Sequence, residues 1–212
     1  MPKYLRYQDY VIRDGRLVGE FDEMYRDHTD PWEQTTRERF ASEKAVALNL
    51  ISRLKAERGA RVVVELGSGL GDFTARIAEL GVHVIGIDIS QTAVDKARAR
   101  HPSIDFICGR FSYHEALRDL KPDIVVMADI TWYVLDELPA FLSFFKRDLP
   151  QTWLIHLLMT YAPGIQRYGA KFFTDLDGIK RYFGLNYLES GLVHYDRGAR
   201  SWFAGRAAAL DA

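Results

Sequence analysis

The segment that most constrains this chain is an apolar run, residues 61–66, followed by three glycines at alternate positions, Gly67, Gly69 and Gly71. Glycine lacks a Cβ atom, so its backbone adopts positive φ at little cost and lets a ligand approach closely. A strand that passes through such a turn into a helix is the arrangement with which α/β proteins hold nucleotides. The spacing therefore predicts a strand, a ligand-binding turn and a helix that begins at Asp72.

A second apolar run, residues 82–88, ends on an acid, Asp88. The end of a neighbouring parallel strand lies beside the glycine turn, where a carboxylate accepts hydrogen bonds from both hydroxyls of a ribose. A dinucleotide fingerprint has Gly or Ala at the place of Asp72, whose carboxylate would repel a pyrophosphate. Glu65, two residues before Gly67, can lie near a cationic ligand. The pattern therefore favours S-adenosylmethionine, which has a ribose and a sulfonium but no phosphate.

The pattern Glu65-x-Gly67-x-Gly69-x-Gly71 followed by Asp88 resembles class I S-adenosylmethionine-dependent methyltransferases, over roughly residues 40–206. The resemblance implies an α/β fold with a Rossmann-like, seven-stranded mixed sheet flanked by helices. It also implies the strand order 3-2-1-4-5-7-6 with an antiparallel last strand. An ordinary α/β domain whose glycines only make a tight turn is the alternative.

The remaining sequence alternates between strand-like and helix-like apolar spacing, which also predicts an α/β fold. The predicted strands are residues 61–66, 82–88, 103–108, 122–128, 152–159, 185–194 and 199–206. The predicted helices are residues 72–80, 91–100, 137–146 and 174–183. Ser90 is expected to cap the second helix, and Thr174 to start the last. Asp196 and Gly198 predict the turn of a closing hairpin.

The first forty residues stand outside this alternation, so we expect an N-terminal hairpin or lid, residues 1–40, ahead of a methyltransferase domain, residues 41–212. Residues 10–18 predict a small hairpin around Asp14-Gly15, and residues 32–56 predict a long amphipathic helix.

The segment Asp30-Pro-Trp32, with Glu38 and Glu43 nearby, is similar to the entry of small methyltransferases in surface-polysaccharide and nodulation-factor pathways. Those relatives act on sugar-derived acceptors, so the resemblance implies a small, saccharide-derived acceptor. In the alternative interpretation, Asp30 caps a helix and Trp32 is a hydrophobic staple.

The resemblance also implies which residues bind the methyl donor. They are Glu65, Gly67, Ser68, Gly69, Gly71, Asp88, Ile89, Arg110, Phe111, Asp129 and Ile130. Arg110 departs from the family, which carries an acid near the adenine amine. Adenine recognition is therefore expected to use backbone atoms, Phe111 or Ser112.

Ligands of open α/β sheets lie beyond the carboxyl ends of the strands, and the acceptor site is expected there. Its candidate residues are Tyr25, His28, Asp30, Trp32, Trp132, Tyr133 and Tyr161. Trp132 and Tyr133 either attract the charged methyl group through their ring faces or simply pack beneath a helix. The candidate catalytic residues are His156, Asp129 and Tyr133. His156 leads as a general base for an oxygen acceptor, although a lone histidine on a central strand is more often a hydrogen-bonded core residue.

Composition and motifs exclude several other functions. A net charge of −1 gives no field that would draw the chain to nucleic acid or to a membrane. The first residues lack the apolar centre of a secretion signal, so a cytoplasmic location is expected. The segment Asp129-Ile-Thr-Trp-Tyr133 has no proline, unlike the loop of base amino-methyltransferases. Cys108 follows no proline, unlike the nucleophile of cytosine methyltransferases, and is expected to be a buried small side chain.

No Asp-Asn pair follows the fifth predicted strand to bind magnesium, so no metal is expected. A small-molecule acceptor remains, methylated on nitrogen or oxygen by a monomer or homodimer. The alternatives are a protein that binds the donor without chemistry and a nicotinamide-dependent oxidoreductase. Asp72 disfavours the oxidoreductase.

Overall fold

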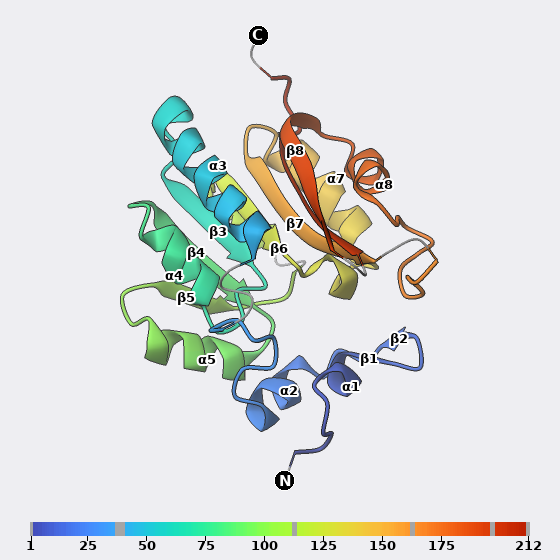
Figure 1. Cartoon of the computed structure of the whole chain (residues 1–212). Coiled ribbons are helices and arrows are strands. Elements are labelled where there is room, and N and C mark those ends of the chain that lie inside the picture. The colour runs from blue at the N-terminus through green and yellow to red at the C-terminus, as the bar shows by residue number, and fades with distance from the viewer. Residues whose placement is uncertain (1, 37–40, 112–113, 162–163, 196–197, 211–212) are drawn as a thin grey trace.

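The computed structural model describes residues 2–36, 41–111, 114–161, 164–195 and 198–210. One seven-stranded sheet dominates the described residues, in the order β5-β4-β3-β6-β7-β9-β8 (Figure 1). The strands are β3 (Val62–Leu66), β4 (His83–Asp88), β5 (Asp105–Cys108), β6 (Ile124–Ala128), β7 (Trp153–Tyr161), β8 (Asn186–Tyr195) and β9 (Gly198–Arg206). Strand β9 runs antiparallel to both of its neighbours, β7 and β8. The predicted strand order and the antiparallel last strand are confirmed.

Helices cover both faces of the sheet (Figure 1). They are α3 (Ser42–Arg58), α4 (Asp72–Ala78), α5 (Gln91–Arg100), α6 (His114–Leu120), α7 (Leu138–Asp148) and α8 (Leu176–Phe183). Apolar side chains of α3 and α4 pack with the sheet in one core cluster, and those of α6, α7 and α8 pack in another. Because both faces are covered, the central strands β3, β6 and β7 are apolar and buried along almost their whole length.

Local signals set several of the boundaries. Helix α5 begins after Ser90, whose hydroxyl oxygen accepts a hydrogen bond from the Ala93 amide at 3.0 Å, as predicted. Helix α8 begins at Leu176, two residues later than predicted, and its N-cap is Asp175. Asp175 accepts a hydrogen bond from the amide of Gly178 at 2.7 Å. Helix α6 was not predicted from the sequence.

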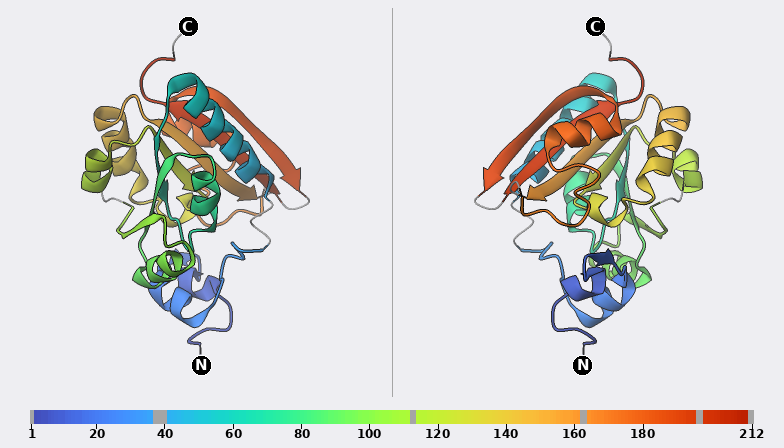
Figure 2. Two further views of the ribbon diagram at one scale, coloured as in Figure 1. Left: turned by 90° about the vertical axis from the view of Figure 1, so that its left-hand side faces the viewer. Right: turned by 90° about the vertical axis from the view of Figure 1, so that its right-hand side faces the viewer.

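Four short elements precede the sheet: α1 (Gln8–Val11), β1 (Ile12–Arg13), β2 (Arg16–Leu17) and α2 (Phe21–Asp27). They lie together at one end of the molecule, beside α5 (Figure 2). Asp22 of α2 fastens them there, because its carboxylate accepts hydrogen bonds from the Ser90 hydroxyl at 2.9 Å and the Thr92 amide at 2.8 Å. The predicted hairpin around Asp14-Gly15 is present but short.

The predicted helix over residues 32–56 is wrong at its start, because α3 begins only at Ser42. The Asp30 carboxylate instead organises a turn, accepting hydrogen bonds from the Gln34 amide at 2.8 Å and the Thr35 amide at 2.9 Å. Asp30 is therefore not a helix cap. Residues 37–40, which include Glu38, lie outside the described residues, as do Ser112 and the hairpin turn at 196–197.

Cys108 is exposed and not buried as predicted. It is the last residue of β5, the outermost strand, so a neighbouring strand covers it on one side only. Within the described ranges, no helix combines the length and the apolar character needed to cross a membrane.

Candidate functional site

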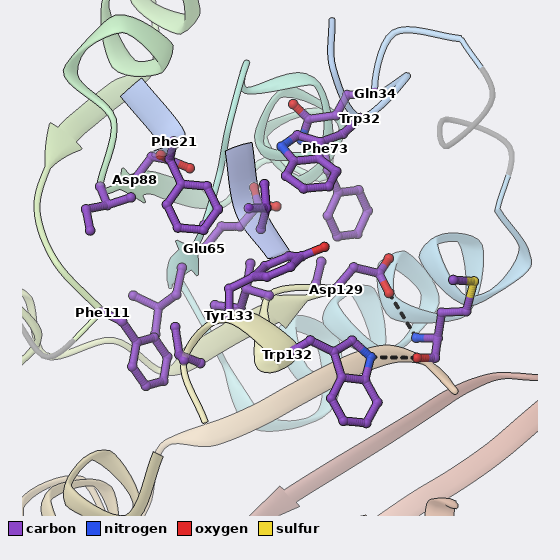
Figure 3. Close-up of a pocket in the computed structure, with 18 of the residues that line it drawn as sticks. Phe21, Trp32, Gln34, Glu65, Phe73, Asp88, Phe111, Asp129, Trp132 and Tyr133 are labelled. Carbon is purple, nitrogen blue, oxygen red and sulfur yellow. Dashed lines mark hydrogen bonds between the residues drawn. The ribbon is translucent and has the colours of Figure 1, made fainter. Parts of the chain in front are cut away.

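A cavity of about 680 Å³ lies where the glycine turn and the ends of β4 and β6 meet the N-terminal segment. The close-up in Figure 3 shows side chains from all of these parts converging on it. Residues from Tyr7 to Gln34 form one wall, and Lys44 of α3 together with residues from β3 onward forms the rest. The cavity therefore brings together segments that are far apart in the sequence.

The glycine turn has no room for side chains. Gly67 has φ of +74°, and a Cβ atom there would lie 2.1 Å from Cγ2 of Ile130. A Cβ atom on Gly69 would lie 2.5 Å from Oε1 of Gln34 and 2.6 Å from the hydroxyl of Tyr25. These positions require glycine because both the backbone angle and the close contacts exclude other residues.

Asp88 closes the turn from the end of β4. Its carboxylate accepts hydrogen bonds from the Gly69 amide at 2.8 Å and the Ser90 amide at 2.9 Å, and the residue is 7% exposed. Burial raises the pKa of Asp88, while the two backbone amides oppose this by stabilising the charged form. The carboxylate is thus held in a fixed orientation beside the turn.

Glu65 is buried at the end of β3 and lines the cavity. Burial raises its pKa to about 7, against the hydrogen bond that the Thr74 hydroxyl donates at 2.5 Å and the charge of nearby Lys44. Lys44 is also buried and lines the same cavity, with its Nζ 5.5 Å from the ring centroid of Phe73. One acidic and one basic side chain therefore lie close together at this end of the cavity.

Asp129 follows β6 with φ of +58°, a conformation that is uncommon for a residue with a side chain. Its carboxylate accepts a hydrogen bond from the Met159 amide at 3.0 Å and lies 3.5 Å from Nη1 of Arg200. The Trp132 indole donates to the Met159 carbonyl at 2.8 Å (Figure 3). The turn after β6 is thereby bound to β7.

Aromatic rings line the side of the cavity that faces the N-terminal segment. The Tyr133 ring lies 5.4 Å from that of Trp32 and 5.7 Å from that of Phe21, between centroids. The Tyr7 ring lies 5.0 Å from that of Trp32. Burial raises the pKa of Tyr133, so its hydroxyl keeps its proton at neutral pH.

Solved structures similar to this chain share its fold. The match to WbdD covers 83% of this chain and 42% of WbdD, with 15% identity and a TM-score of 0.60. The match to TehB from Haemophilus influenzae covers 84% of this chain and 66% of TehB, with 14% identity and a TM-score of 0.60. The match to the PH0226 protein from Pyrococcus horikoshii OT3 covers 87% of this chain and 99% of PH0226, with 18% identity and a TM-score of 0.59. WbdD is a bifunctional kinase-methyltransferase.

Residues 63–150 match the family model of a methyltransferase domain. Over these residues the chain is similar to methyltransferases. A segment of 68 residues is also 40% identical to the biotin biosynthesis bifunctional protein BioHC of Cellvibrio japonicus (strain Ueda107). That segment covers 32% of this chain and 14% of BioHC.

The structure brings many of the predicted site residues to the cavity. Those that line it are Tyr25, Trp32, Glu65, Gly67, Asp88, Ile89, Phe111, Asp129, Ile130, Trp132, Tyr133 and Tyr161. Those that do not line it are His28, Asp30, Ser68, Gly69, Gly71, Arg110 and His156. Gly69 and Gly71 shape the turn, and Asp30 shapes the segment that carries Trp32 and Gln34.

His156 is not placed to act as a base. It is 0% exposed on β7, and its ring stacks on that of Phe203 at 4.8 Å between centroids. Its Nε2 shares a hydrogen bond of 2.7 Å with the hydroxyl of Thr131. Burial lowers its pKa to about 3. His156 is therefore a hydrogen-bonded core residue and not the general base that was expected.

Sequence reasoning missed several residues that line the cavity: Tyr7, Phe21, Gln34, Lys44 and Arg200. None of them belongs to the glycine pattern. The charged residues among them, Lys44 and Arg200, lie within ordinary amphipathic patterns of a helix and a strand. Only their burial distinguishes them, and burial depends on the tertiary structure.

Proposed function

We propose that this protein transfers a methyl group from S-adenosylmethionine to a nitrogen or oxygen atom of a small, saccharide-derived acceptor. The observation that carries the proposal is a cavity lined both by Asp88 with the glycine turn and by several aromatic rings. Asp88 and the turn suit a nucleoside without phosphate, and the rings suit a second small molecule.

The residues around the glycine turn fit the methyl donor. In this proposal Asp88 accepts hydrogen bonds from the ribose hydroxyls, and Gly67, which lines the cavity, presents its backbone to the nucleoside. Lys44 and Glu65 offer opposite charges to the carboxylate and the ammonium group of the amino-acid end. S-adenosylmethionine supplies a methyl group already activated by its sulfonium charge.

The aromatic residues of the cavity fit a sugar ring. Trp32, Tyr133 and Phe21 present large ring surfaces on which the C–H face of a sugar packs, because the negative face of an aromatic ring attracts positively polarised hydrogens. The hydroxyls of Tyr7, Tyr133 and Tyr161 add hydrogen-bonding groups to the same side. The similarity of the Asp30-Pro-Trp32 segment to enzymes with sugar-derived acceptors agrees with this choice.

The chemical step asks mainly for positioning. The lone pair of the acceptor nitrogen or oxygen forms the bond to the methyl carbon, and the sulfur–methyl bond breaks with its electron pair remaining on sulfur. The acceptor's proton passes to solvent or to a carboxylate. Holding the two molecules in line supplies much of the rate. No histidine is present among the described residues that line the cavity.

The first test is calorimetric titration with S-adenosylhomocysteine, the demethylated product, followed by transfer of a labelled methyl group to a panel of sugars and amino sugars. We expect micromolar binding and label in at least one sugar. Binding without transfer to any acceptor would favour a protein that binds the donor without chemistry. Binding of a nicotinamide dinucleotide in place of S-adenosylhomocysteine would contradict the proposal.

A further inference from the structure

Three charged side chains from distant parts of the chain form a row beside the cavity. Nη1 of Arg200, on β9, lies 2.5 Å from Oε1 of Glu43, on α3. The same nitrogen lies 3.5 Å from Oδ2 of Asp129, in the turn after β6. Arg200 and Asp129 both line the cavity.

The burial of this row is costly. Glu43 is 0% exposed, and its second oxygen, Oε2, has no hydrogen-bond partner in the part of the chain that the structure describes. The Arg200 side chain is only 13% exposed. Removing charges from water costs about as much as their attraction returns, so a buried ion pair is a poor device for stability alone. Arg53 and Glu189 already join α3 to β8 at the surface, at 2.7 Å.

The row also restrains a strained residue. Arg200 lies directly opposite Met159 in the pairing of β7 with β9. The Met159 amide and the Arg200 guanidinium contact different oxygens of the Asp129 carboxylate. A non-glycine residue with positive φ persists where its surroundings fix it, and such residues cluster at ligand sites. The antiparallel end of the sheet therefore fixes the carboxylate at the cavity wall.

Of the two carboxylates in this row, only that of Asp129 belongs to a residue that lines the cavity. We propose that Arg200 is a positioning residue of the methyl-donor site, which holds Asp129 so that its carboxylate meets the ammonium group of the donor's amino-acid end. The inference rests on the proposed function. In this proposal β9 contributes to donor binding through Arg200, which contacts neither the ribose nor the adenine.

Two ligands separate this role from a general structural one. S-adenosylhomocysteine has the amino-acid end, whereas 5′-methylthioadenosine has the same adenosine and sulfur without it. For Arg200→Met we expect about tenfold weaker binding of S-adenosylhomocysteine, since an interaction with a charged group is disturbed. The affinity for 5′-methylthioadenosine should change less than about twofold, because this ligand lacks the group that the substitution affects. Arg200→Lys, which keeps the charge, should bind S-adenosylhomocysteine more tightly than Arg200→Met.

Further variants complete the calorimetric test. Arg53→Met removes the other ion pair between α3 and the closing strands and should change neither affinity. Asp129→Asn should reproduce the selective loss, and Arg200→Met should add little to it, because both changes affect one interaction.

Equal weakening of both ligands by Arg200→Met and Arg200→Lys would show a structural role and overturn the inference. So would unchanged binding of S-adenosylhomocysteine in Arg200→Met or in Asp129→Asn. Failure of the unaltered protein to bind either ligand would contradict the proposed function itself, and that result is distinct from a loss confined to the variants.

Discussion

The side-chain oxygen of Gln34 accepts a hydrogen bond from the backbone amide of Leu70 at 2.9 Å. This contact joins the N-terminal segment to the glycine turn across 36 positions of sequence. The Tyr25 hydroxyl lies over Gly69 beside it. The N-terminal segment therefore covers the turn directly and does not merely lie near it.

Replacing Gln34 with alanine should weaken binding of S-adenosylhomocysteine by about threefold to tenfold, since one neutral hydrogen bond contributes about 0.5–1.5 kcal/mol. Calorimetry measures the change. Gln91→Ala, which alters only an exposed contact with Asp95 on α5, serves as the control. Equal affinities for Gln34→Ala and the unaltered protein would show that the contact does not support the donor site.

Replacing Asp88 with alanine should weaken binding of S-adenosylhomocysteine by about 1–3 kcal/mol, because a hydrogen-bonded charged acceptor is lost from the ribose position. The melting temperature should also fall, since the Gly69 and Ser90 amides lose their partner. Asp105→Ala is the control, because Asp105 is exposed and pairs only with exposed His83 among the described residues. An unchanged affinity in Asp88→Ala would refute the ribose assignment.

Glu65 should make stability depend on pH. Its pKa is about 7 in the folded protein against an ordinary value of 4.5, so the folded state holds the proton more tightly. The associated stability is present below pH 4.5 and is lost as the pH rises through about 7. Each unit of pKa difference corresponds to about 1.4 kcal/mol.

Denaturation with urea at pH 5 and at pH 8 measures this effect of Glu65. Glu65→Gln should be less sensitive to pH over that interval than the unaltered protein. Donor binding should show the opposite trend, because the ionised carboxylate suits the ammonium group better as the pH rises through about 7. Identical pH profiles for the two proteins would contradict the prediction.

His156 should affect stability and not chemistry. Its folded pKa of about 3 lies below the ordinary value of 6.5, so its contribution is present above pH 6.5 and is lost as the pH falls toward 3. The stability of His156→Phe should fall less on acidification than that of the unaltered protein. Its affinity for S-adenosylhomocysteine should stay within about twofold. A large loss of methyl transfer without a loss of stability would return His156 to a catalytic role.

The strands and the donor end of the site were predictable because their signals are local. Each strand of the sheet was predicted within two residues of its ends, since apolar runs between turn residues are set by neighbouring positions. Gly67 and Asp88 were found for the same reason. The spacing of the glycines indicates which positions of the turn have positive φ. Asp88 is recognisable because it ends the next apolar run.

The N-terminal segment shows where local signals fail. Residues 32–56 have helical spacing, yet α3 begins at Ser42 because Asp30 binds the following amides and sets a turn. The placement of Trp32 beside Tyr133 then depends on how this turn meets the sheet. No periodicity within the segment contains that information.

The sequence by itself determined the strand order through its family resemblance, the glycine turn and the acid at the end of β4. Only the tertiary structure decided that His156 is enclosed in the core while Lys44 and Arg200 reach the cavity. The physical reason is that burial and charge pairing are properties of the assembled layers. Glu43, Asp129 and Arg200 are far apart in the chain, and only the closing of β9 against β7 brings them together.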